Sequence, residues 1–95
     1  MQIKLSELRE VTNRLFDHLD GLGLESVEIN DDYYWSIPKD QLYDPYQKPI
    51  HLDLGQLSDD WNDLREVLNE EMDEVSYNLV DLAAILKVIG ERVIM

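Results

Sequence analysis

Apolar residues follow a helical period in the last quarter of the chain, Glu74–Met95. They recur there at steps of three and four residues, which places them on one face of a helix. This stripe consists of Val75, Leu79, Leu82, Leu86, Ile89 and Val93. Between Leu79 and Ile89 only Asp81 and Lys87 are charged, so the other faces are also largely apolar. A helix that is apolar nearly all round must be covered by its neighbours, and we expect it to be the most buried helix of the fold.

The same period predicts a first helix over Ser6–Leu22. Its apolar stripe is formed by Leu8, Val11, Leu15, Leu19 and Leu22, with Phe16 beside it. Ser6 is the expected N-cap, because a serine side chain readily accepts a hydrogen bond from an amide of the first turn. Gly21 and Gly23 mark the end, since glycine takes the left-handed conformation that closes many helices.

A second helix is predicted to begin near Asp53, where Asp53 and Gln56 have the spacing of a capping box. Its apolar stripe is formed by Leu54, Leu57, Trp61, Leu64 and Leu68. The stripe is too short for a free-standing coiled coil, so this helix should pack within the domain. A start at Ser58 is the alternative, and it would leave Leu54 and Leu57 in an extended lead-in.

Between these two helices the apolar period changes from helical to alternating. Polar residues alternate with apolar ones in Glu25–Asn30 and again in Tyr33–Ile37, and the turn-forming run Asn30, Asp31 and Asp32 joins the two segments. The pattern predicts two strands joined by a tight turn. Because an isolated hairpin is only marginally stable in water, we expect it to lie against the helices. One helical turn, Lys39–Tyr43, should follow Pro38.

These elements predict a mostly helical α+β fold, with three main helices and a small two-stranded hairpin between the first and the second. The 95 residues should form one compact domain, residues 1–95, with a modest core. The chain has no cysteine, which excludes disulfides and thiolate metal sites and fits the cytoplasm. No signal pattern opens the sequence, and the longest apolar run, Leu82–Leu86, is far short of a membrane span. We therefore expect a soluble, cytoplasmic protein.

Charge is the strongest compositional feature. There are 21 acidic and 8 basic residues, which give a net charge of −13. Residues 53–74 hold nine acids and one base, a net charge of −8, whereas residues 75–95 hold two of each. Such a chain is repelled by nucleic acid and by anionic membranes, and it attracts basic partners. The alternative is that the acids only maintain solubility.

Motifs for catalysis are missing from the sequence. His18 and His51 lie far apart without neighbouring motif residues, and there is no phosphate-binding glycine loop, nucleophile elbow or zinc-protease motif. Four acids crowd one side of the second helix, namely Asp59, Asp60, Asp63 and Glu66. The calcium-loop pattern is absent, and a solvated helix face explains them. We expect no enzymatic activity, no cofactor and no metal ion.

The segment from Asp31 to Tyr46 is the best candidate for a binding site. It holds five of the eight aromatic residues, interleaved with four acids, and tyrosine and tryptophan predominate in binding hot spots. Neighbours in a strand point to opposite faces, so we expect a buried Trp35 and a Tyr34 that is at least partly exposed. The candidate partner-binding residues are Asp31, Asp32, Tyr34, Tyr43 and Asp44. The alternative is that the whole aromatic cluster seals the core.

Three stretches, YYWSIP, QLYDPY and LDLGQLSDDW, resemble a family of small, acidic, uncharacterised bacterial proteins. That resemblance implies one compact domain and no particular activity. In its physical character the chain is also similar to bacterial immunity proteins, which use acids beside a tyrosine pair to bind a basic nuclease toxin. Tyr33 and Tyr34, after Asp31 and Asp32, would play that part. In the colicin-type proteins, however, the pair lies on a short helix of an all-helical bundle, whereas here it is predicted on a strand.

The function expected from these observations is that of an acidic protein-binding module that masks a basic partner, such as a toxin, in the manner of an immunity protein or antitoxin. Complementary charge would speed association, and buried tyrosines would slow release. Direct binding to nucleic acid or to membranes is not expected. Two alternatives remain open: an accessory protein whose acidity serves solubility, and a nucleic-acid mimic in which the acids of residues 53–74 imitate phosphates.

Overall fold

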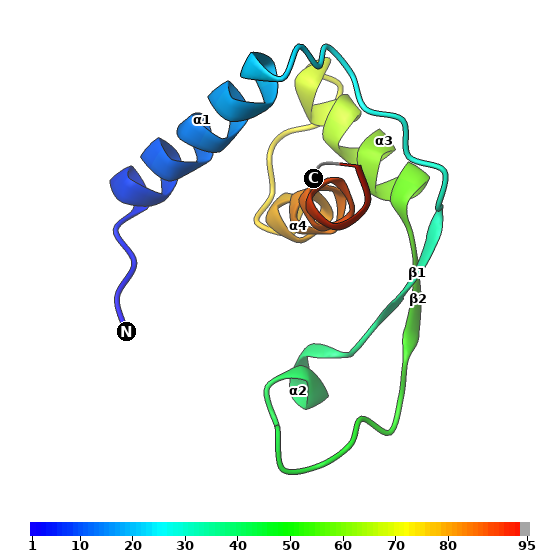
Figure 1. Cartoon of the computed structure of the whole chain (residues 1–95). Coiled ribbons are helices and arrows are strands. Elements are labelled where there is room, and N and C mark those ends of the chain that lie inside the picture. The colour runs from blue at the N-terminus through cyan, green and yellow to red at the C-terminus, as the bar shows by residue number, and fades with distance from the viewer. Residues whose placement is uncertain (94–95) are drawn as a thin grey trace.

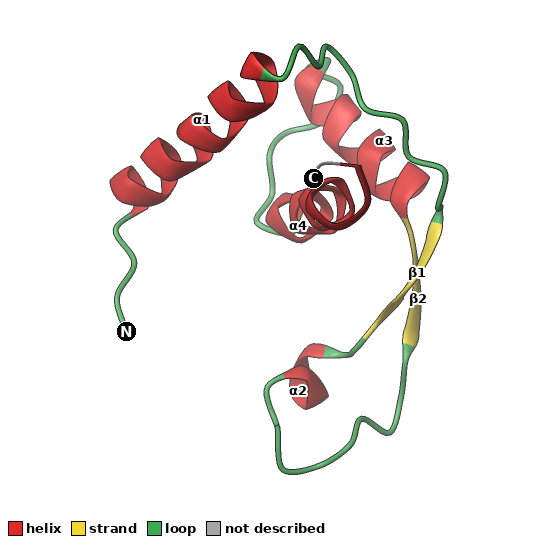
Figure 2. Cartoon of the chain, in the orientation of Figure 1, coloured by secondary structure: helices red, strands yellow, loops and turns green. Residues whose placement is uncertain are grey.

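The computed structural model describes residues 1–93, which contain three helices of at least seven residues and a two-stranded antiparallel sheet. The sheet lies between the first and the third helix of the chain, so the predicted α+β class is confirmed. The elements are α1 (Leu5–Gly21), β1 (Tyr33–Ser36), α2 (Lys39–Leu42), β2 (Asp53–Gln56), α3 (Leu57–Leu68), α4 (Asn78–Val88) and the π-helical segment η1 (Ile89–Val93) (Figure 1, Figure 2). The predicted end of the last helix at Ile94 and Met95, with the side chain of Val93, lies outside the described part of the chain.

Helix α1 begins at Leu5, and the predicted cap at Ser6 is wrong. The capping position is Lys4, whose side chain makes no capping hydrogen bond. The carbonyl oxygen of Lys4 already accepts a helical hydrogen bond from the amide of Leu8 at 3.0 Å, so Ser6 lies inside the first turn. Beyond the end of α1, Gly23 has a φ of 79°, the left-handed conformation expected of a glycine that closes a helix.

The two strands of the sheet are distant in sequence, and the predicted hairpin partner is wrong. β1 pairs with β2 in antiparallel register, so that Trp35 lies opposite Leu54. Glu25–Asn30 forms no strand; it is an extended connection in which Val27 and Ile29 are half-buried and their polar neighbours are exposed. Alternation is the pattern of any extended segment with one covered side, and here it does not mark a strand.

Helix α3 starts at Leu57, close to the alternative start at Ser58 and well after the predicted start at Asp53. Its first turn is capped from the segment before β1. The Asp32 carbonyl oxygen accepts a hydrogen bond from the Leu57 amide at 2.7 Å, and Asp32 Oδ1 accepts one from the Ser58 amide at 2.8 Å. The capping-box spacing at Asp53 was misleading because the real cap comes from a distant part of the sequence.

The core of the molecule lies between α3 and α4. Leu57 is 6% exposed and Ile85 is 8% exposed, and these are the buried apolar residues of the described chain. α4 also buries Asp81, so it holds more buried residues than the other described helices, as predicted. At its start, however, Leu79 and Val80 are exposed. The rest of the chain therefore covers only part of the apolar surface of α4.

The chain is extended for its length. Its radius of gyration is 15.3 Å, whereas a compact domain of this size has about 12 Å. Residues 33–56, which we call the arm, carry β1, α2 and β2 away from the α3–α4 pair, and α1 extends on another side (Figure 1). The expectation that the hairpin lies against the helices is therefore wrong for the outer part of the arm and holds only at its base.

Candidate functional site

The structure divides the five predicted binding residues between the two ends of the arm. Asp31, Asp32 and Tyr34 lie at its base, where the chain enters β1 beside α3. Tyr43 and Asp44 follow α2 near the far end of the arm (Figure 1). The sequence therefore identified two places that the fold does not bring together, and each is described separately.

Asp32 holds the start of α3 against the base of the arm. Besides the amide of Ser58, its carboxylate accepts hydrogen bonds from the Ser58 hydroxyl at 3.2 Å and from Gln56 Nε2 at 2.8 Å. The bond from the Gln56 side chain, followed by that from the Ser58 amide, lowers the pKa of Asp32 below its usual value. Because the Asp32 carboxylate accepts three hydrogen bonds within the chain, its main role is structural.

Tyr34 links the arm to α3. Its hydroxyl donates a hydrogen bond to Asp60 Oδ2 at 2.6 Å, and its ring lies across Gly55, the residue opposite it in the sheet. A Cβ at position 55 would overlap this ring, which explains a glycine inside β2. Burial and the bond to Asp60 raise the pKa of Tyr34 above its usual value.

The prediction for the two faces of β1 is wrong at Trp35 and confirmed at Tyr34. Trp35 should be buried but is 70% exposed, whereas Tyr34 is half-buried and so partly exposed, as expected. Neighbours do point to opposite faces, as predicted. Alternation alone did not show which face is covered. The face of β1 that carries Tyr34 can approach α3 because the residue opposite Tyr34 is Gly55. On the other face Trp35 pairs with Leu54, which is exposed as well.

Asp31 pairs with Arg92 of η1. Arg92 Nη2 lies 2.7 Å and Nε 3.1 Å from Asp31 Oδ2. Both side chains are more than half exposed, so the pair contributes at most about 1 kcal/mol to stability. It nevertheless joins the base of the arm to the C-terminal segment.

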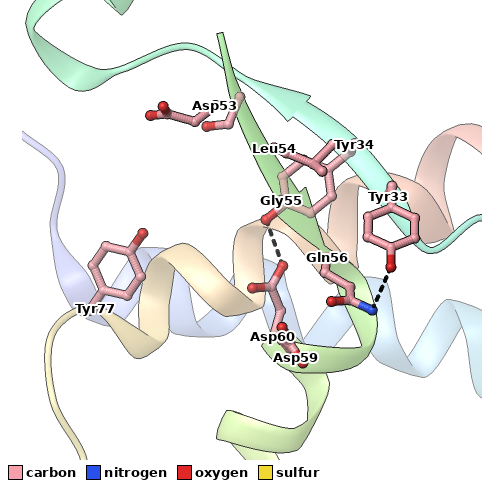
Figure 3. Close-up of a pocket in the computed structure, with 10 residues that line it drawn as sticks. Tyr33, Tyr34, Asp53, Leu54, Gly55, Gln56, Asp59, Asp60 and Tyr77 are labelled. Atoms are coloured by element: carbon pink, nitrogen blue, oxygen red, sulfur yellow. Dashed lines mark hydrogen bonds between the residues drawn. The ribbon is translucent and has the colours of Figure 1, made fainter.

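A concavity of about 360 Å³ lies at the base of the arm, beside the first turn of α3 (Figure 3). Its lining includes three tyrosines and three aspartates, which are Tyr33, Tyr34, Tyr77, Asp53, Asp59 and Asp60. Gln56 Nε2 donates to the Tyr33 hydroxyl at 3.4 Å and orients that ring. No lysine, arginine or histidine is among its lining residues in the described chain. Aromatic faces and carboxylates in one opening suit a cationic group.

Sequence reasoning did not include Asp60 and Tyr77 in the site. Both lie outside the segment from Asp31 to Tyr46, and they reach the concavity only because β2 pairs with β1 and α4 packs on α3. The available signal was Gly55, a glycine just after the predicted helix start at Asp53. A glycine opposite an aromatic residue is a recurring arrangement in sheets, but it is visible only once the register is known.

The far end of the arm presents two exposed tyrosines. Asp44 Oδ1 accepts a hydrogen bond from the Tyr46 amide at 3.2 Å, a short turn made by the aspartate side chain. The side-chain oxygen of Gln41 accepts hydrogen bonds from the amides of residues 50 and 51 and closes the loop. Tyr43 is 82% exposed and Tyr46 is 94% exposed, so this ordered loop holds both rings in solvent.

Asp81 is a buried carboxyl group on the face of α4 that packs against α3. It is 3% exposed, and Asn78 Nδ2 donates a hydrogen bond to its Oδ2 at 3.4 Å. Burial, together with the neighbouring carboxylates of Asp63 and Asp60, raises the pKa of Asp81 above its usual value. The sequence showed this residue only as one of two charges in an apolar helix.

Across residues 1–93, no group of three histidine, aspartate or glutamate side chains is placed to hold a metal ion. Within the same residues, no helix is both long and apolar enough to pass through a bilayer. The ion pairs of this part of the chain are Arg14–Glu10, Lys87–Glu91 and Arg92–Asp31. None of them involves the nine acids of residues 53–74, which leaves that surface uncompensated.

No protein-family model, no curated protein and no solved structure matches this chain. The function is therefore inferred from the two ends of the arm and from the charge that surrounds them.

Proposed function

We propose that this chain is an acidic protein-binding module that masks a basic partner, in the manner of an immunity protein or antitoxin. The observation that carries the proposal is the concavity at the base of the arm, which gathers tyrosine rings and aspartate carboxylates without a basic lining residue in the described chain. A lysine or arginine side chain of the partner would meet both kinds of group there. Masking would be steric and electrostatic, with no chemical step.

The distribution of charge supports a basic partner. Residues 53–74 carry a net charge of −8, and the ion pairs of the described residues leave all of these acids free to attract cations. Opposite charges on two proteins raise the association rate, and salt screens this effect over about 8 Å at physiological ionic strength. Association should therefore be fast and sensitive to salt.

The exposed aromatic residues of the arm supply the short-range part of the interaction. Tyr33, Trp35, Tyr43 and Tyr46 are all exposed, so the alternative in which the whole cluster seals the core does not hold for this chain. Large aromatic side chains that become buried on binding are frequent anchors, and losing one typically costs about 2 kcal/mol or more. Such anchors would slow the release of the partner.

The five predicted residues take different parts in this proposal. Tyr43 and Asp44 are exposed near the end of the arm and would touch the partner directly. Asp31 adds charge near the concavity, although it already pairs with a cation. Asp32 and Tyr34 are engaged in bonds that hold the arm on α3, so they would shape the site and contribute little contact.

The test is capture of the partner from a lysate of cells that encode this chain, followed by binding of the identified protein at low and high salt. One triple variant, Asp59→Asn, Asp63→Asn and Glu66→Gln, removes three charges from α3. A matched control, Glu7→Gln, Asp17→Asn and Asp20→Asn, removes three from α1. The captured protein should be basic, and the α3 variant should bind it about tenfold more weakly, which corresponds to about 1.4 kcal/mol. The α1 variant should bind like the wild type.

Three outcomes would count against this function. Equal losses in both variants would mean that only net charge matters and that no particular face binds. Binding that stays constant between low and high salt would rule out electrostatic masking. Capture of no basic protein under conditions where the chain is folded would leave the acids with a role in solubility alone.

A further inference from the structure

One chain of this protein has more surface than a closed domain of its mass. The accessible surface is 8679 Å², whereas a folded monomer of this mass has about 5,700 Å². The excess is therefore about 3,000 Å² per chain. Obligate homodimers bury about 2,000–5,000 Å² in total, so the uncovered surface is ample for a stable dimer.

Helix α1 leaves its apolar stripe exposed. No residue of α1 is buried, and the stripe predicted as its core face is exposed at Leu8, Val11, Leu15 and Leu22, with Phe16 beside it. Most of the stability of a helix in a protein comes from packing its apolar face. Within the described residues the apolar stripe of α1 is left largely uncovered, so it is available to a cover from another molecule.

The uncovered surface continues from α1 onto α4. A groove of about 400 Å³ separates the two helices and is lined by apolar side chains that include Leu15, Phe16, Leu19 and Leu86. At the start of α4, Leu79 and Val80 are exposed. We call the stripe of α1, this groove and the start of α4 the α1–α4 face.

We infer that a second copy of this chain covers the α1–α4 face. The segments that form it are nearly neutral, since residues 1–24 have a net charge of −1 and residues 75–95 a net charge of zero. Two copies can meet there while residues 53–74, with their charge of −8, stay apart. A basic partner would gain no electrostatic attraction on this face, whereas a groove and an exposed helix on the same chain permit a two-fold, self-complementary contact.

The first experiment is light scattering of the purified chain over a range of concentrations, combined with thermal unfolding. We expect a mass twice the 11.2 kDa of one chain, with dissociation on dilution. Because a dimer is stabilised by mass action, the melting temperature should rise with protein concentration. A mass of one chain and a melting temperature that does not depend on concentration would overturn the inference, and would do so without touching the proposed binding of a basic protein.

A pair of variants then locates the interface. Leu15 is 60% exposed, so Leu15→Asp places a charge on the α1–α4 face with little loss of packing inside one chain. Asn13→Asp adds the same charge on the opposite side of α1, because two residues along a helix are about 200° apart. Leu15→Asp should weaken association by about thirtyfold or more, and Asn13→Asp should leave the dimer intact.

These variants distinguish a dimer formed through the α1–α4 face from one formed through another face, and from general charge repulsion. A Leu15→Asp chain that still forms a wild-type dimer would show that another face is used. Equal dissociation by both substitutions would show general charge repulsion and overturn the assignment to this face. Should Leu15→Asp unfold the chain, the smaller change Leu15→Ala replaces it, and a dissociation constant unchanged from the wild type would refute the contact.

Discussion

Helices α3 and α1 have equally regular apolar stripes, yet the fold treats them differently. α3 packs on α4, buries Leu57 and receives its cap from Asp32 on another segment. α1 buries no residue and its capping position makes no side-chain bond. An amphipathic stripe therefore predicts that a helix forms. It does not predict whether the apolar face is covered within the chain.

The largest expected difference between the two regions is in the effect of truncating an apolar side chain. Ile85→Ala leaves a cavity between α3 and α4 and should lower the free energy of unfolding by about 2–5 kcal/mol. Leu15→Ala, measured at low protein concentration, should cost less than about 1 kcal/mol, because Leu15 is 60% exposed in one chain. Urea unfolding of both variants gives the comparison. Equal losses at every concentration would mean that α1 is packed within one chain.

Much of this arrangement was predictable from local sequence. Helical spacing located α1, α3 and α4 and the mostly helical α+β class, although α3 and α4 begin four residues later than predicted, at Leu57 and Asn78. Pro38 marked the start of the short helix α2. Interactions between segments that are distant in sequence were predicted less well. Asp53 has the spacing of a capping residue, and only the pairing of β1 with β2 reveals that Asp32 is the cap.

The candidate site was less predictable for the same reason. Tyr34 and Trp35 were correctly placed on opposite faces of a strand, but alternation cannot say which face is covered. That depends on Gly55, which lies opposite Tyr34 across a sheet whose register the sequence does not encode locally. The concavity draws Tyr77 from the segment before α4, and a periodicity argument has no means of bringing that residue to the arm.

The next largest loss of stability is expected at the junction between the packed region and the arm. Gly55→Ala should displace the ring of Tyr34 and lower the free energy of unfolding by about 1–3 kcal/mol, the usual cost of overpacking. In a Tyr34→Ala background the same change should cost much less, because the two residues act as one unit. Gly21→Ala is the control, since a Cβ there meets no neighbour, and it should change stability by less than about 1 kcal/mol. Additive effects of the changes at positions 34 and 55 would contradict the contact.

A smaller effect is expected at the cap of α3. Asp32→Ala removes three accepted hydrogen bonds and should lower the melting temperature at neutral pH. Because the pKa of Asp32 is lowered in the folded chain, its stabilisation is present above its ordinary value of 3.8 and is lost as the pH falls below it. The difference between wild type and variant should thus shrink from about pH 7 to about pH 3. A difference that is constant with pH would assign the effect to packing.

The smallest expected change in stability comes from Asp81, the charge buried in the best-packed part of the molecule. Replacing Asp81 should stabilise the chain, whereas the substitutions above destabilise it. The pKa of Asp81 is raised, so the folded chain holds this proton more tightly than the unfolded chain. Stability should accordingly fall as the pH rises from 3.8 to the raised value and stay reduced above it. Asp81→Asn keeps an oxygen that can accept the hydrogen bond from Asn78 Nδ2, and it removes the charge. It should therefore raise the melting temperature at neutral pH and lose this advantage in acid. Asp73→Asn removes an equal charge from an exposed position, and an equal gain there would show that relief of net charge, and not of burial, is responsible.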